Sequence, residues 1–393
     1  MELEYIKEPQ KFIQQNLFAD DEVFVPFDPP LFFDSLIRWQ FNEDIWFLSS
    51  KDLSYLLVSG YGVSLSKHSE RLIIKDGKKT VYEVPFFRLK NLAIMSKGVG
   101  LSSDLIEKLN KSNINLSFHD FSGKPYALVQ SIFTNQSSEI KRKQLLSQNS
   151  KIALSLIKRI VCGKIANQIS LLKYVVKNVQ SDNQEGANKI QVVQKACLNM
   201  KKYASTAASL AEFEEYTQIR NAVMGYEGTA ARIYWDVIGF LLSAKVNFQG
   251  RNDKIPHDAV NTLLNYGYGI LYCQIWESIV LAGLDPYVGF LHTSQSGKPS
   301  LVFDLIEEFR APIIDRTVFA FIMLNRKIEI TNNMLGFDTR QSFSQKVLDR
   351  LSSCEYYEGQ KVLLSDIILA QAKRFANCLQ NETVKYNPFV FKW

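Results

Sequence analysis

The sequence predicts an α+β protein: a small β-rich N-terminal domain followed by an all-α domain, with an acidic, aromatic-rich extension before both. Two observations predict this order. Short β-branched runs separated by turn signals give way to a helical period near residue 138, and the first fifty residues differ in composition from the other residues of this 393-residue chain. We place the extension at 1–50, the β-rich domain at 51–130 and the helical domain at 138–393.

The extension is acidic although the whole chain carries a net charge of +6. Residues 1–50 hold three basic and ten acidic side chains, a net charge of −7, which leaves +13 on the remainder. Aromatic residues recur between Phe24 and Phe47, and so much aromatic surface is atypical of a disordered tail. We expect this segment to pack on the rest of the chain or on a partner.

The β-rich domain is predicted from five short apolar runs with turn signals such as Ser59-Gly60 and Asp76-Gly77 between them. After Gly98 and Gly100, a serine at 102 or 103 is a suitable N-cap for a helix that reaches about Asn110. A further strand is expected from Asn115. The five runs are 55–59, 63–66, 71–75, 80–84 and 92–95.

The helical domain is predicted from apolar residues that recur at three- and four-residue steps. A polar stretch at 180–187 indicates the turn of a helical hairpin, and helices are expected onward to about Gln380. The final aromatic segment, 386–393, has no assigned role. The first helix shows the period at Leu154, Ile157, Val161, Ile165, Ile169, Leu172 and Val176.

Sequence features also exclude several protein classes. The acidic first residues lack the apolar core of a secretory signal, and the most apolar stretch, 270–284, is too short and too polar to span a bilayer. Five scattered cysteines without a C-x-x-C pair disfavour a disulfide framework or a zinc site. We therefore expect a cytoplasmic protein with no membrane partner.

The stretch 139–202 is the most basic part of the chain, with thirteen lysines and arginines against three acidic residues. Such a block indicates a polyanionic partner. The alternative is a solvated basic helix face.

Glu227 lies within Gly225–Ala231, on a predicted helix that otherwise buries Ile233, Trp235 and Ile238. An unpaired buried carboxylate is costly, so a glutamate among small residues on such a helix is unusual. The small neighbours also allow close approach of a large ligand. The alternative is a surface glutamate.

A second group of polar residues follows about sixty positions later. His292 ends an apolar run and enters a loop, where the alternative is a structural hydrogen bond. Ser300 is a suitable cap for a helix from Leu301 on which Asp304 and Glu307 share one face. A solvated acidic face is the alternative there, and Glu308 fits it well.

Together, one carboxylate, one imidazole and an acidic helix can hold a divalent cation with open positions, as phosphodiester chemistry requires. The sequence also resembles the CRISPR-associated integrase family Cas1, from about Leu56 to its end. Six segments carry the resemblance in order: 98–107, 163–168, 225–231, 264–269, 282–286 and 289–310.

The resemblance implies a metal-dependent DNA integrase and endonuclease that inserts new spacer DNA into a CRISPR array by 3′-OH transesterification. It assigns Glu227, His292 and Glu307 as metal ligands in the helical, catalytic domain, and Asp304 as an additional catalytic acidic residue beside the metal. Two oxygens and one nitrogen favour Mg²⁺ or Mn²⁺, with Mn²⁺ better suited to the imidazole.

The resemblance also implies partners: prespacer and repeat or leader DNA, a second copy of the chain through the β-rich domain, and the small protein Cas2 in an integration complex. Intramolecular salt bridges are the alternative for Arg232 and Arg310. The candidate DNA contacts are Lys158, Arg159, Lys201, Lys202, Arg232, Lys298 and Arg310.

Two other functions stay open. A transposon integrase of the same superfamily, a casposase, usually carries an extra DNA-binding module, and no clear helix-turn-helix follows Asp349. A non-catalytic DNA scaffold requires an inert metal site.

Overall fold

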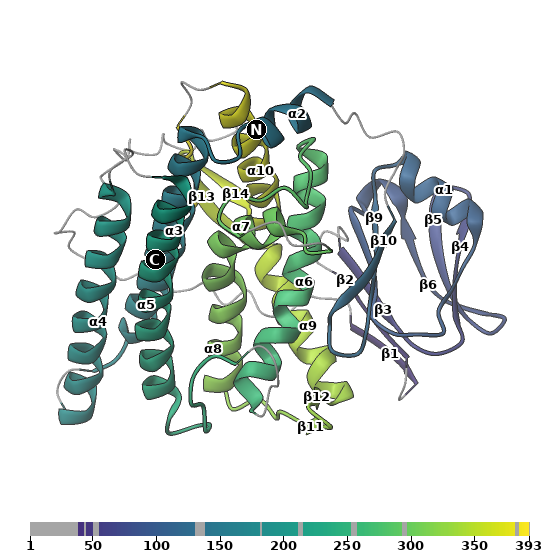
Figure 1. Cartoon of the computed structure of the whole chain (residues 1–393). Coiled ribbons are helices and arrows are strands. Elements are labelled where there is room, and N and C mark those ends of the chain that lie inside the picture. Colours follow the sequence, from purple (N-terminus) through teal and green to yellow (C-terminus); the bar gives the residue numbers. More distant parts are fainter. Residues whose placement is uncertain are drawn as a thin grey trace, which may run out of the picture.

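The computed structural model describes residues 38–42, 45–49, 55–129, 138–180, 183–210, 215–252, 258–292, 297–381 and 385–392. A β region lies to one side of a larger helical region, as Figure 1 shows. Most of the predicted extension falls outside the described residues, so its docking role stays a prediction.

The β region consists of two sheets packed around one apolar core. The core includes Leu56, Leu92 and Leu116, which are register partners on parallel strands, and Leu105 from the intervening helix. The first sheet has the order β1 (Arg38–Asn42), β2 (Ile45–Ser49), β3 (Tyr55–Ser59), β7 (Asn91–Ile94), β9 (Asn115–His119) and β10 (Pro125–Val129). The second has the order β6 (Lys79–Pro85), β5 (Arg71–Asp76), β4 (Val63–His68) and β8 (Gly100–Leu101), and α1 spans Ser103–Lys111.

Strands β1 and β2 belong to the first sheet although they lie within the segment assigned by sequence to the extension. They form an antiparallel pair, and β2 continues the sheet onto β3. The sheet therefore begins before residue 51.

The helical region is built around α3, whose predicted apolar stripe is buried. Leu154, Ile157, Val161 and Ile165 all belong to the main hydrophobic core. Helices α4, α5 and α7 pack against α3. The helices are α2 (Ser138–Leu146), α3 (Lys151–Val176), α4 (Gln184–Ser209), α5 (Tyr216–Leu242), α6 (Ala259–Leu281), α7 (Ser300–Phe309), α8 (Arg316–Met323), α9 (Phe337–Leu351) and α10 (Leu364–Gln380). In the described part of the chain, no helix is long and apolar enough to cross a membrane.

Two short hairpins interrupt the predicted run of helices. One joins β11 (Ile330–Thr331) to β12 (Met334–Leu335), and the other joins β13 (Cys354–Tyr357) to β14 (Gln360–Leu363). Each has a two-residue turn with positive φ at both positions, Asn332-Asn333 and Glu358-Gly359. Such turns match the twist of paired strands.

Candidate active site

Two carboxylates from different helices converge on one lysine. Glu227 of α5 and Glu307 of α7 both form ion pairs with the ammonium of Lys164, which α3 supplies. The Nζ atom lies 2.5 Å from Glu307 Oε2. The structure thus brings together two of the predicted ligands, eighty residues apart in sequence, around a cation from a third helix.

The electrostatics keep this cluster charged. Burial alone would raise the pKa of Glu307, but the Arg310 and Lys164 charges lower it to about 2. The Arg310 guanidinium is 2.8 Å from Glu307 Oε1. Burial would lower the pKa of Lys164, yet Glu307 and Glu227 raise it above its ordinary value. Glu307 is therefore anionic and Lys164 cationic at neutral pH.

His292 is fixed by Asp304, which is fully buried on the first turns of α7. The Asp304 carboxylate accepts the backbone N–H groups of Phe290, Leu291 and His292 at 2.6, 3.0 and 2.9 Å. The imidazole Nδ1 lies 2.8 Å from Asp304 Oδ1. This contact engages Nδ1 and leaves Nε2 as the nitrogen for a metal ion or a proton.

The loop that carries His292 lies against the start of α7. Ser300 does not cap this helix as predicted, because α7 already includes it and Pro299 precedes it. Instead its hydroxyl donates to the Tyr287 carbonyl and accepts the Gly289 N–H, at 2.7 and 2.9 Å. A Cβ on Gly289 would lie 2.7 Å from the Ser300 side chain, so only glycine allows this approach.

Asp304 also changes the protonation of His292. Burial alone would lower the pKa of His292, but the hydrogen bond and charge of Asp304 raise it above its ordinary value. A carboxylate that orients a histidine in this way also makes the imidazole a stronger ligand.

We predict that Asp304→Asn weakens Mn²⁺ binding by roughly tenfold to a hundredfold, because it removes the anionic partner of the imidazole. Titration of Mn²⁺ by calorimetry measures the effect, with thermal unfolding as the check on folding. Wild-type Mn²⁺ affinity in a folded Asp304→Asn protein would show that Asp304 does not act through His292.

The donor set has the chemistry of a site for Mg²⁺ or Mn²⁺: two carboxylates and one imidazole. Glu307 Oε2 is buried and accepts no hydrogen bond from the described residues, although Lys164 approaches it. In the part of the chain that the structure describes, no three His, Cys, Asp or Glu side chains are arranged to hold an ion as they stand. A cation between Glu227 and Glu307 therefore requires Lys164 to move.

Glu308, one residue beyond Glu307, does not belong to a solvated acidic face, so that prediction is wrong. It is fully buried. Its carboxylate accepts the Tyr386 hydroxyl, the Phe389 N–H at 3.0 Å and the Gln371 amide at 3.1 Å. Burial raises the pKa of Glu308 to about 7. Its role is structural, because its carboxylate connects α7 to α10 and to the C-terminal segment.

A tyrosine–aspartate network supports Arg310 behind the site. Tyr268 places its ring 5.0 Å from the Arg310 guanidinium and donates its hydroxyl to Asp315 at 2.5 Å. Tyr234 donates to the same carboxylate at 2.9 Å. Arg310 and Asp315 bound a π-helix directly after α7, a geometry that is frequent at functional sites.

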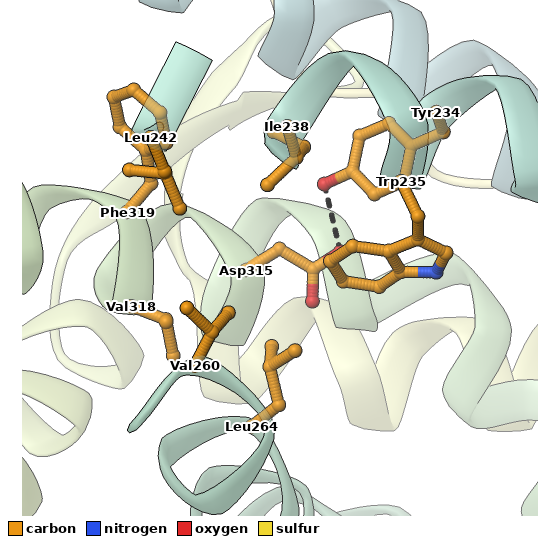
Figure 2. Close-up of a pocket in the computed structure, with 9 residues that line it drawn as sticks. All are labelled: Tyr234, Trp235, Ile238, Leu242, Val260, Leu264, Asp315, Val318 and Phe319. Carbon is orange, nitrogen blue, oxygen red and sulfur yellow. Dashed lines mark hydrogen bonds between the residues drawn. The ribbon is translucent and has the colours of Figure 1, made fainter. Parts of the chain in front are cut away.

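Figure 2 shows Asp315 and Tyr234 at the edge of a small apolar cavity between α5, α6 and α8. Its volume of about 10 Å³ admits roughly one water molecule, so no substrate binds there.

Sequence reasoning missed Lys164, Asp315 and Tyr234 as members of this assembly. Lys164 had a signal, since it lies in both the basic stretch and the 163–168 segment. Asp315 and Tyr234 had none, because only the π-helix and the packing of α5 bring them together.

The predicted DNA contacts divide into accessible and inaccessible residues. Lys158 is only 7% exposed, and its ammonium donates to the Leu210 carbonyl at 2.6 Å, which corrects its predicted role. Arg310 forms the salt bridge that was its alternative. Arg159 and Lys201 are partly exposed, whereas Lys202, Arg232 and Lys298 are exposed.

The chain is similar to known proteins over most of its length. Residues 56–347 match the family model described as "CRISPR associated protein Cas1". The chain is 32% identical to "CRISPR-associated endonuclease Cas1 1" of Archaeoglobus fulgidus, over 86% of this chain and 99% of that protein. It is 33% identical to the protein of the same name from Francisella tularensis subsp. novicida, over 87% and 100%.

Two solved structures share the fold. A casposase bound to integration product aligns with a TM-score of 0.67 at 23% identity, over 85% of this chain and 92% of that one. A Cas6-RT-Cas1–Cas2 complex aligns with a TM-score of 0.67 at 19% identity, over 87% of this chain and 36% of that one.

Proposed function

Because the chain belongs to the CRISPR-associated protein Cas1 family, we propose that it is a metal-dependent DNA endonuclease and integrase that inserts new spacer DNA into a CRISPR array. The observation that carries this proposal is the convergence of Glu227 and Glu307 on the Lys164 ammonium. Beside them is His292, which the buried Asp304 holds in place. Glu227, His292 and Glu307 are the proposed ligands of Mg²⁺ or Mn²⁺.

A bound divalent cation would supply positive charge at the scissile phosphate and at the leaving 3′-oxygen. The residues of the chain prepare the site for this charge. Asp304 fixes the ring of His292 and engages Nδ1, so that Nε2 is the ligand nitrogen. Arg310 holds Glu307 anionic and in place.

Exposed Lys298 and Arg232 lie on the loop before α7 and on α5, where their charges favour DNA phosphates. With the 3′-hydroxyl of a spacer as nucleophile, the reaction is transesterification, and with water it is cleavage. We therefore propose both activities.

The helix beside Glu227 is suited to close approach by DNA. Gly225 and Gly228 lie one turn apart on α5, and a Cβ on either would contact nothing within 4 Å. Packing within the protein therefore does not require glycine at these positions, although each glycine destabilises the helix by roughly 1 kcal/mol relative to alanine. Close approach by DNA would explain why both positions are glycine.

The proposed partners are prespacer DNA, repeat or leader DNA, a second copy of the chain and a Cas2 protein. The similar Cas6-RT-Cas1–Cas2 complex supports Cas2, and the family relation supports DNA. The β-rich domain is the proposed homodimer surface.

The test is whether the purified protein joins a short duplex with free 3′-hydroxyl ends to a plasmid that carries a CRISPR repeat and leader. The proposal requires products that are joined at the repeat and that increase with Cas2. Joining at plasmid sites without the repeat would favour a transposon integrase such as a casposase, to which this chain is similar in fold. DNA binding without joining or cleavage would favour a scaffold.

We predict that Lys201→Gln/Lys202→Gln weakens DNA binding equally for all sequences. Each lysine that no longer neutralises a DNA phosphate lowers the slope of log affinity against log salt by about one, so the double variant lowers it by up to about two. Fluorescence anisotropy at several salt concentrations measures both quantities.

The matched control is Lys78→Gln/Lys79→Gln, an adjacent lysine pair at the exposed turn between β5 and β6. We expect this control to bind like wild type. Equal slopes for both double variants and wild type would make the α4 lysines part of a solvated face.

A further inference from the structure

The aromatic segment 385–392 is neither helix nor strand, yet its aromatic side chains are among the most buried of the protein. Tyr386, Phe389 and Phe391 are 1%, 3% and 1% exposed. The segment contacts α3, α7 and α10, so it joins three separate helices. We call residues 385–392 the strap.

The strap forms hydrogen bonds to two helices through two buried side chains. Glu308 of α7 accepts the Tyr386 hydroxyl and the Phe389 N–H. Asn167 of α3 donates to the carbonyls of both Glu308 and Phe389 at 2.8 Å, and accepts the Phe391 N–H at 3.1 Å. One asparagine side chain thus links α3, α7 and the strap.

Apolar contacts fix the same position. The Phe389 ring stacks on Phe309 of α7 with a centroid distance of 5.7 Å and an interplanar angle of 12°. Pro388 lies directly on Gly163 of α3, where a Cβ would be 2.4 Å from the proline ring. The strap therefore packs in direct contact with both α3 and α7.

The anchoring residues adjoin the residues of the candidate active site. Gly163 precedes Lys164 on α3, and Glu308 follows Glu307 on α7. Lys164 and Glu307 in turn meet at 2.5 Å. Any slide or rotation of α7 against α3 changes both sets of contacts, because helices are rigid over one turn.

We propose that the strap positions Glu307 for catalysis and, before a cation binds, holds Lys164 against it, with Asn167, Glu308 and Tyr386 as positioning residues. The inference rests on the proposed function for its catalytic consequence, but the placement of Lys164 can be tested without DNA or metal. Side chains that hold a site must be locked by packing and by hydrogen bonds, and buried bonds to a carboxylate are among the stronger ones.

The experiment compares wild type with Tyr386→Phe, Asn167→Ala and a control, Tyr266→Phe. Tyr266 is fully buried and its hydroxyl lies 3.0 Å from Ser344 Oγ, between α6 and α9, so the control also removes one buried hydroxyl group. Each folded protein is labelled briefly with acetic anhydride, and mass spectrometry gives the rate at Lys164 relative to the other lysines. Lys164 is held in two ion pairs, and its side chain is 13% exposed.

We expect the Lys164 rate to rise at least threefold in Tyr386→Phe and further in Asn167→Ala, and to stay at the wild-type value in Tyr266→Phe. Because Glu307 is then displaced as a ligand, the two strap variants should also bind Mn²⁺ at least threefold more weakly and lower kcat for joining with little change in KM for DNA. A Lys164 rate equal to wild type in both strap variants overturns the proposal. If the Lys164 rate rises in both strap variants but the wild-type protein binds no Mn²⁺, the positioning role of the strap is supported and the proposed function is contradicted.

Discussion

Glu307→Gln is expected to reduce strand joining and DNA cleavage by roughly a hundredfold to a thousandfold, the range seen when charge stabilisation of a transition state is lost. Glutamine keeps the shape of the side chain but removes the anionic charge between Lys164 and Arg310. A divalent cation then loses a charged ligand. DNA affinity should change little, because it comes mainly from the basic surface.

Single-turnover joining of a labelled duplex measures the first effect, and anisotropy measures the second. Glu329→Gln is the control, because Glu329 is also paired with a lysine but lies between α8 and β11 rather than on α7. A Glu307→Gln protein that joins and cleaves DNA at the wild-type rate would remove Glu307 from the ligand set.

The second large effect is on stability. Glu308→Ala should lower the free energy of unfolding by about 3 kcal/mol, because it leaves the Tyr386 hydroxyl, the Phe389 N–H and the Gln371 amide buried without their acceptor. Urea unfolding measures the change. An unfolding free energy within about 0.5 kcal/mol of wild type, the scatter of ordinary surface substitutions, would contradict the buried network.

The same residue predicts a pH dependence. Its pKa is about 7 in the folded protein against 4.5 for an ordinary glutamate, so the folded state binds the proton more tightly. The stability that Glu308 contributes is therefore fully present below about pH 4.5 and is lost as the pH rises towards 7. Glu308→Gln should remove this decline, so the stability difference between Glu308→Gln and wild type should grow in favour of the variant over that interval.

Glu307 and Glu308, neighbours in sequence, thus have different contacts. Successive helical residues lie about 100° apart around the axis, so Glu307 and Glu308 face different surroundings. Glu307 meets cations from α3 and the π-helix, whereas Glu308 meets the strap. From sequence both fitted an acidic face, because only the packing of residues far along the chain distinguishes them.

The elements of the fold were predictable where periodicity is strong. The buried stripe of α3 and six strands of the β region, β3 to β7 and β9, follow from apolar spacing, and the α+β class is confirmed. Strands β1, β2, β8 and β10 were not predicted. The hairpins at 330–335 and 354–363 were missed because their strands are short and their turns lack the usual Asn-Gly or Asp-Gly pair. The Cas1 resemblance is also confirmed.

The candidate site was predictable only in part. Glu227 and Glu307 were selected through the resemblance, since residues eighty positions apart show no spacing that pairs them. Lys158 and Lys164 both lie in the basic stretch, but one is buried under the end of α4 and the other bridges the two carboxylates. Composition cannot separate such residues, because tertiary contacts decide which lysine meets DNA, a carbonyl or a carboxylate.

The central claim is that a divalent cation held by Glu227, His292 and Glu307 is required for DNA joining. The most direct measurement is joining of a labelled duplex to repeat-containing plasmid by metal-stripped protein, with added Mn²⁺, with added Mg²⁺ and with excess EDTA. We predict joined product with either ion, none in EDTA, and recovery when Mn²⁺ is restored. Undiminished joining in excess EDTA would contradict the metal mechanism.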